Sequence, residues 1–256
     1  MSFPKLLKEA AKHFTRHGYT SQADINDWRV RLLTAAEQHL DPEGARDKIR
    51  RSLSSAFFKA IGEGRIAKRH GSVHKFTIDR LEPHLRDELE RRMFAAQELV
   101  DGDKRATLER IHNRFLGLAT AGPNPGEAQA AAQGIGKAAR DSKAQERMTA
   151  VDQTKKLVAG LDEIIAKDGD SIGGYWDATY DIARKHRPEH AARHDRFYVR
   201  RGSWADTQGL VRHPDGYMDE WDFPGVLINC QCEYRYVYDL SDCPEEALTA
   251  KGRAAA

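Results

Sequence analysis

The residues with the greatest capacity for chemistry lie in the last third of this 256-residue chain. An Arg-Pro-Glu-His turn occupies residues 187–190, and an Asn-Cys-Gln-Cys segment follows at residues 229–232. Imidazole nitrogens and thiolate sulfurs are the ligands that tetrahedral zinc prefers in proteins. This region is therefore the first place in which to expect either a metal site or a tightly specified piece of architecture.

Four of these residues form a candidate structural zinc set, with His213 as a spare ligand. His190 and His194 are spaced so that a helical backbone would carry both imidazoles on one side. Cys230 and Cys232 would point to the same face of a strand. Cys-x-Cys is a poorer zinc spacing than Cys-x₂-Cys. In the competing interpretation the cysteines are therefore small buried apolar residues, and His190 forms a hydrogen bond to the backbone. Beyond this candidate zinc, we predict no cofactor and no catalytic residue.

Arg187 admits two roles. Its guanidinium could hold a carboxylate or a phosphate through two parallel hydrogen bonds, or it could form a buried salt bridge with Asp152 or Asp181. We favour the salt bridge, because Asp152 lies on the preceding helix, where a link to the loops is needed. Trp176 and Pro188 are also assigned structural roles, as a core anchor and as the residue that fixes the turn.

Charge is unevenly distributed, although the net charge is only +2. Residues 1–120 carry 23 Lys/Arg against 17 Asp/Glu, whereas residues 121–256 carry 18 against 22. The basic excess concentrates in residues 46–69, which could bind phosphates or an acidic protein face. A solvated helix face is the alternative. The candidate binding residues are Arg46, Lys48, Arg50, Arg51, Arg65, Lys68 and Arg69.

Consecutive helices are predicted for residues 1–120. Ser21 begins a capping pattern, after which apolar residues recur at helical spacing. Asp41-Pro42 has the order of an N-cap followed by an N1 proline and predicts the start of the next helix. Two further helices are expected at residues 79–100 and 103–120.

The AGPNPG segment at residues 121–126 is the predicted domain boundary. Residues 121–141 are rich in Pro, Gly and Ala and are interpreted as a linker or arm, followed by a helix over residues 142–167. Residues 241–256 are the C-terminal tail, and its last part, Lys251–Ala256, is expected to be disordered at its end.

Short strands are predicted within residues 142–240, at 175–179, 197–199, 226–229 and 233–238, separated by Pro and Gly turns. The predicted fold class is therefore α+β: a mostly helical N-terminal region, then a small domain with a short antiparallel sheet and long loops.

The order of features in residues 142–240 resembles the phage Mu F-like head morphogenesis family, the minor head proteins of tailed phages. The resemblance is most specific at its C-terminal end, where Gln231 stands in place of the Arg that is usual between the cysteines. The matching elements here are Asp152-Gln-Thr-Lys-Lys-Leu157, Trp176, Arg187-Pro-Glu-His190, Phe197-Tyr-Val-Arg-Arg-Gly202, Pro224-Gly225 and Asn229-Cys-Gln-Cys232.

The resemblance implies a virion component, made in the host cytoplasm and placed at the portal vertex or the capsid interior. Such proteins act during head assembly and DNA packaging and are not enzymes by their shared motif. Portal protein, major capsid protein and packaged DNA, contacted without sequence specificity, are the implied partners. Residues 1–120 would then be the phage-specific region that binds them.

A zinc-dependent DNA-binding protein or nuclease is the alternative function, because zinc with an open position can activate water. The chain lacks paired carboxylates and a His-Asn-His order that would favour a nuclease, and it lacks a P-loop pattern for ATP-driven packaging. No apolar run approaches the roughly 20 residues that span a bilayer, so no membrane partner is expected.

Overall fold

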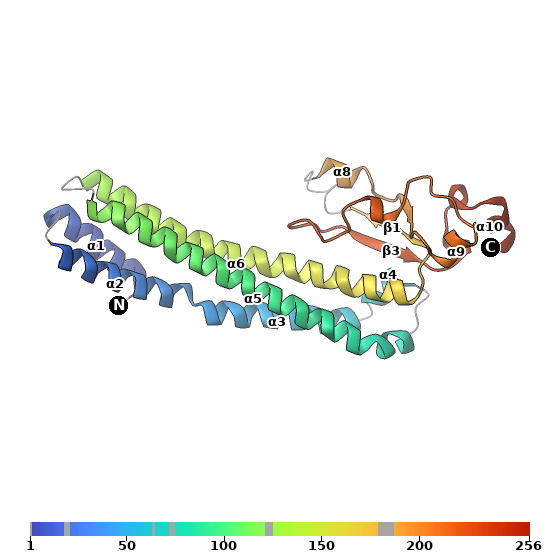
Figure 1. Ribbon diagram of the computed structural model, residues 1–256, viewed down its shortest axis with the longest axis horizontal. Helices are drawn as coiled ribbons and strands as arrows, with labels where there is room; N and C mark the ends of the chain where they lie inside the picture. Colours follow the sequence, from blue (N-terminus) through green and yellow to red (C-terminus); the bar gives the residue numbers. More distant parts are fainter. Residues whose placement is uncertain (1, 18–20, 63–64, 72–74, 121–124, 179–186) are drawn as a thin grey trace. The chain divides into compact units, whose positions relative to one another are not determined.

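The computed structural model describes residues 2–17, 21–62, 65–71, 75–120, 125–178 and 187–256 (Figure 1). The chain divides into two compact units. Unit 1 comprises residues 1–50 and 94–150, and unit 2 comprises residues 51–93 and 151–256. Three helices contribute residues to both units, so each unit is assembled from segments that are distant in the sequence.

Unit 1 is entirely helical in its described part. Ser21 caps its second helix by accepting a hydrogen bond from the backbone N–H of Asp24 at 3.1 Å, and the Asp41 carboxylate accepts the N–H of Gly44 at 3.1 Å. Both predicted helix starts are therefore confirmed. The helices are α1 (Phe3–His17), α2 (Gln22–Leu40) and parts of α3 (Pro42–Gly62), α5 (Lys75–Thr120) and α6 (Pro125–Asp168).

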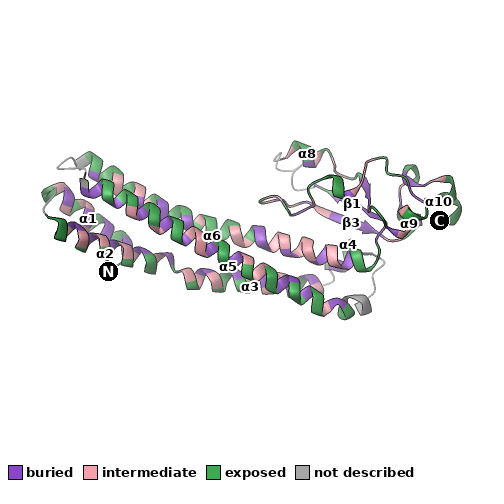
Figure 2. Ribbon diagram, viewed as in Figure 1, coloured by how far each residue is buried: buried purple, intermediate pink, exposed green. Residues whose placement is uncertain are grey.

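The core of unit 1 lies between the apolar stripes of these helices, whose buried positions recur along one face (Figure 2). Phe14 of α1 is at its centre, with its ring 5.8 Å from that of Phe115 on α5 and 6.4 Å from that of Trp28 on α2. Ile135 and Ala139 bring α6 into the same cluster. Small residues on α6 let it pack closely, which explains the role of its Ala-rich sequence.

Unit 2 combines the remaining helical segments with a three-stranded antiparallel sheet in the order β2-β1-β3. β1 is central: Gly174 pairs with Tyr198 on one side and with Tyr236 on the other. The strands are β1 (Gly173–Asp177), β2 (Phe197–Val199) and β3 (Glu233–Val237). The helices are α4 (Arg65–Arg69), α8 (Pro188–Ala191), α9 (Trp204–Thr207), α10 (Ala250–Ala255) and the 3₁₀ turns η1 (Met218–Glu220), η2 (Leu240–Asp242) and η3 (Glu245–Ala247).

The sheet buries both faces. One face carries Trp176, Tyr198 and Tyr234 and packs with Ala166 of α6. The other carries Phe197 and packs against the segments that follow the strands. This alternation places Trp176, Tyr198 and Tyr234 on the face that also contains the two cysteines of the 229–232 segment.

The predicted fold class is confirmed, but several predicted boundaries are wrong. Residues 75–120 form one helix rather than two, and residues 125–141 are the start of α6 rather than a linker. The AGPNPG segment separates two helices of one unit; its residues 121–124 lie outside the described part. Residues 226–229 form turns, not a strand. None of the described helices is long and apolar enough to span a bilayer.

The tail is ordered, contrary to prediction. Thr249 caps α10 by accepting the N–H of Gly252 at 3.0 Å, and its own N–H donates to the carbonyl of Leu210 at 3.0 Å. Gly252 is buried, and a Cβ there would lie 2.0 Å from the Leu210 carbonyl oxygen. Glycine therefore lets the tail approach the backbone of residue 210.

We expect Gly252→Ala to destabilise unit 2 by about 1–3 kcal/mol, because the added methyl must displace backbone. Thermal unfolding followed by circular dichroism would measure the loss. Gly71→Ala is the matched control, since a Cβ at residue 71 would meet nothing within 4 Å. Equal melting temperatures for the two variants would contradict the close packing of α10.

Candidate metal centre

Three potential metal ligands meet in the interior of unit 2. The Nδ1 atom of His190 lies 3.3 Å from the Sγ atom of Cys232 and 3.7 Å from that of Cys230. The ligand atoms of the three residues all lie within 4.8 Å of one another. The three side chains are 2 %, 1 % and 4 % exposed for His190, Cys230 and Cys232. The centre is therefore closed to bulk solvent.

The Arg-Pro-Glu-His turn positions the imidazole. Pro188 is the first residue of α8, where its fixed φ suits the helix and its missing N–H is not needed. The N–H of His190 donates to the carbonyl of Arg187 at 3.1 Å. The ring of Trp176 meets the imidazole edge-on at 5.4 Å. Trp176 is fully buried, so its predicted role as a core anchor is confirmed.

A left-handed residue positions the thiols. Asn229 has a φ of 60°, a conformation that asparagine tolerates better than most residues. The next N–H, that of Cys230, donates to the carbonyl of Leu227 at 3.0 Å. The cysteines therefore lie in the turn that precedes β3 and not on a strand as predicted. The turn, rather than strand alternation, brings both thiols toward His190.

The chemistry of the centre suits a thiophilic metal. Tetrahedral zinc with Zn–S bonds of about 2.3 Å and Zn–N bonds of about 2.0 Å places N and S ligands about 3.5 Å apart. The two observed N···S separations, 3.3 and 3.7 Å, bracket this spacing. A hydrogen bond from Cys232, backbone hydrogen bonds and the nearby His190 lower the pKa of the Cys230 thiol to about 5. The centre thus favours a thiolate, which is the form that binds metal.

His194 does not join the centre, contrary to prediction. Its Nδ1 accepts the N–H of Ala178 at 3.1 Å and lies 3.7 Å from a carboxylate oxygen of Asp177. The four-residue spacing fails because α8 ends at Ala191, so residue 194 is no longer on the helix. His213, the spare ligand, instead packs on Tyr217 with ring centres 4.3 Å apart.

Arg187 and Asp152 hold the same loop, although not through the predicted mutual salt bridge. Nη2 of Arg187 donates to the carbonyl of Ile228 at 2.7 Å, and the N–H of Asn229 donates to the Asp152 carboxylate at 2.8 Å. In the described part of the chain, Asp152 pairs with Lys156, at 2.9 Å. Asp181, the other predicted partner, lies outside the described residues. Both side chains therefore anchor the loop by way of its backbone.

The predicted phosphate-binding block is largely ion-paired. Arg46 pairs with Asp101, Lys48 with Glu146 at 3.5 Å and Arg50 with Asp47 at 3.4 Å. Arg46, Lys48 and Arg50 belong to unit 1, whereas Arg51, Arg65, Lys68 and Arg69 belong to unit 2. Lys68 is exposed, and the side chain of Arg65 lies outside the described part. The block is therefore divided between two units and partly neutralised.

A buried network that the sequence did not reveal surrounds Asp162. Its carboxylate accepts from Nε of Arg69 at 2.8 Å and lies 3.2 Å from Nε2 of His70. His70 is fully buried, stacks on Tyr236 at 4.7 Å and shares a hydrogen bond with the hydroxyl of Tyr238. Burial raises the pKa of both tyrosines. No local spacing links residues so distant in the sequence.

No protein-family model matches the chain, and no curated protein or solved structure shows significant similarity to it.

We expect Asp152→Ala to lower the free energy of unfolding of unit 2 by about 1.5–3 kcal/mol, because the partly buried N–H of Asn229 loses a charged acceptor. Chemical denaturation followed by tryptophan fluorescence would measure this. Asp152→Asn, which keeps a neutral acceptor, should lose less. As a control, Glu82→Ala removes an exposed carboxylate that pairs with Arg86 within α5 and should cost less than about 0.5 kcal/mol. An equal loss in Glu82→Ala and Asp152→Ala would contradict the anchoring role.

Proposed function

We propose that the protein is a minor head protein of a tailed bacteriophage, acting at the portal vertex or in the capsid interior during head assembly and DNA packaging. One observation supports this most: the motif segments of the resemblance converge. Asp152, the Arg-Pro-Glu-His turn and the Asn-Cys-Gln-Cys segment contribute to one buried centre. Residues that matter together in such a family would be expected to meet in this way.

We further propose that the centre binds a structural zinc ion through His190, Cys230 and Cys232. Zinc would supply a cross-link between α8 and the turn before β3. A catalytic zinc keeps a position open to substrate, whereas these three side chains are almost completely buried. Burial therefore favours the structural role over the alternative of a zinc-dependent nuclease.

The helical unit supplies a surface suited to an assembly partner. A groove of 900 Å³ between α1 and α6 has apolar residues such as Phe3 and Leu7 in its wall. None of the described residues that line it is Asp or Glu, and burial and the neighbouring Lys143 lower the pKa of His39, which also lines it. The cationic residues that line it are Lys8, Lys12, Arg16, Arg140 and Lys143.

The charge of the groove supports an acidic partner. Among the described residues, none of these five cations forms an ion pair with a carboxylate of the chain. An amphipathic helix places apolar anchors on one face and charges beside them, and such helices commonly dock in apolar grooves. We propose that the groove receives an acidic amphipathic helix of the portal or major capsid protein.

Zinc content tests the metal centre. We expect about one zinc per chain by elemental mass spectrometry, consistent with a set of thiolate and imidazole ligands. Cys230→Ser, Cys232→Ser and His190→Ala should each lose most of this zinc and lower the melting temperature. His194→Ala is the matched control and should retain zinc. Retention of zinc by all three centre variants would contradict the assignment.

Particle composition tests the assembly role. Quantitative mass spectrometry of purified particles should find the protein at a copy number close to that of the portal protein. The double charge reversal Lys12→Glu/Arg140→Glu should reduce incorporation by about tenfold or more, because like charges would repel an acidic helix. Lys5→Glu, which alters an exposed lysine of α1 outside the groove, should be incorporated normally. Absence of the wild-type protein from particles and from procapsids would overturn the proposal.

A further inference from the structure

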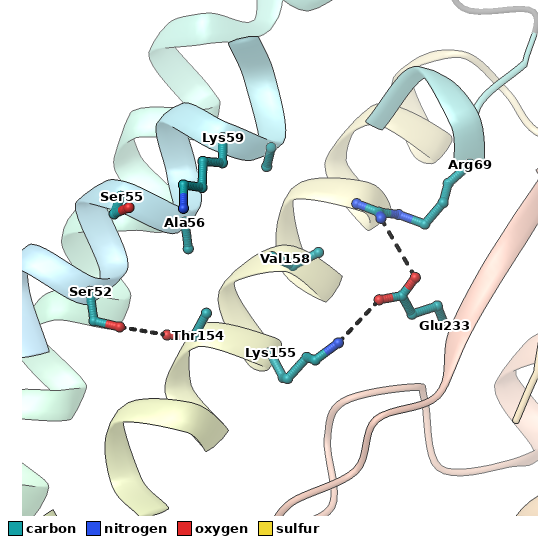
Figure 3. Close-up of a pocket in the computed structure, with 10 residues that line it drawn as sticks. Ser52, Ser55, Ala56, Lys59, Arg69, Thr154, Lys155, Val158 and Glu233 are labelled. Carbon is teal, nitrogen blue, oxygen red and sulfur yellow. Dashed lines mark hydrogen bonds and ion pairs between the residues drawn. The ribbon is translucent and has the colours of Figure 1, made fainter. Parts of the chain in front are cut away.

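A cavity in unit 2 is independent of the candidate metal centre and of the proposed assembly role. Its volume is 360 Å³, and it lies between α3, α4, α6 and β3 (Figure 3). Hydroxyl and cationic side chains dominate its polar lining. They are Ser52, Ser55 and Lys59 of α3, Arg69 of α4, Thr154 and Lys155 of α6, with Glu233 of β3 as the one carboxylate among the lining residues.

Several hydrogen-bond donors in the cavity are available to a ligand. Ser52 and Thr154 share a long hydrogen bond of 3.4 Å between their hydroxyl oxygens. Lys59 is exposed and forms no ion pair with any carboxylate in the described part of the chain. Nη2 of Arg69 is buried and has no hydrogen-bond partner among the described residues. Figure 3 shows Lys59 and Arg69 on opposite walls of the cavity.

Glu233 orients two cations without neutralising the cavity. One carboxylate oxygen lies 3.3 Å from Nζ of Lys155, and the other lies 3.5 Å from Nη1 of Arg69 (Figure 3). Arg69 is also held by Asp162 through Nε. Three cations therefore face two carboxylates, and Lys59 supplies the unmatched positive charge.

The donors suit a tetrahedral oxyanion. A phosphate group offers several acceptor oxygens that point in different directions, and charge-assisted hydrogen bonds to them are the strong ones. Lysine binds phosphate as a point charge, and hydroxyls complete the remaining contacts. A volume of 360 Å³ is at the small end of ligand pockets. We propose that this cavity binds a phosphate group, either free, on a nucleotide, or in a nucleic-acid backbone.

Isothermal titration calorimetry of the full chain at low salt, in a buffer without phosphate, would test the site. The three probes are inorganic phosphate, AMP and a short DNA duplex. We expect at least one probe to bind saturably. Binding of phosphate alone identifies the free anion, tighter binding of AMP identifies a nucleotide, and binding of the duplex alone identifies a backbone phosphate.

Variants distinguish specific binding in the cavity from non-specific electrostatic attraction. Lys59→Ala should lower the affinity for the probe that binds by about tenfold or more, the size expected for a charge-assisted hydrogen bond. Lys59→Arg should retain most of the affinity. Ser55→Ala should weaken it less. Lys68→Ala, an exposed lysine that does not line the cavity, should leave affinity unchanged. Circular dichroism would confirm that each variant folds.

Two results would overturn the proposal. One is the absence of saturable binding for all three probes. The other is an equal loss of affinity in Lys59→Ala and Lys68→Ala, which would indicate non-specific electrostatic attraction that fades with added salt. Neither result bears on zinc content or on particle composition, so this site can fail while the proposed function stands.

Discussion

The carboxylates on the last part of α6 hold unit 2 together, and most of its other features depend on them. Asp152 accepts a hydrogen bond from the backbone N–H of Asn229, and Asp162 accepts one from Arg69, the last residue of α4. Glu163 receives two hydrogen bonds from Arg200, at 2.7 and 2.8 Å, where the chain leaves β2. Each acid thus fixes a different segment to one helix. Buried charges are costly unless several partners satisfy them, and paired geometry of this kind meets that condition.

Anchoring of the 229–232 turn brings together the ligands of the candidate metal centre. The backbone at Ile228 and Asn229 is held from two sides, by Arg187 and by Asp152. With the turn fixed, two thiols and one imidazole face one another inside an aromatic shell. A ligand set held in this way needs little reorganisation to accept a metal, because the surrounding hydrogen bonds already orient its members. The same contacts explain why Arg187 is adjacent to Pro188: the proline sets the turn from which both Arg187 and His190 extend.

The two units offer different chemistry. The groove of unit 1 combines apolar residues with cations that form no ion pair among the described residues, which suits an acidic helix of another protein. The cavity of unit 2 is smaller and lined by hydroxyls, which suits a compact anion. The basic block of the sequence contributes to both units, but ion pairs within the chain occupy much of it. Charge counts alone therefore overstate the positive surface, since a cation beside a carboxylate contributes little to attraction at a distance.

The sequence alone predicted the helix starts after Ser21 and Asp41, the fold class and the segments that form the candidate centre. Caps such as Ser21 and Asp41 act within one helical turn, so a helix start of this kind can be predicted from neighbouring residues in the sequence. It did not determine that Cys230 and Cys232 lie in a turn, that His194 points elsewhere, or that Asp162 gathers Arg69 and His70. Nor did it show that residues 125–141 continue into α6, because glycines that weaken an isolated helix are tolerated where packing stabilises it. These points become visible only in the folded protein, since each depends on contacts between residues far apart in the chain.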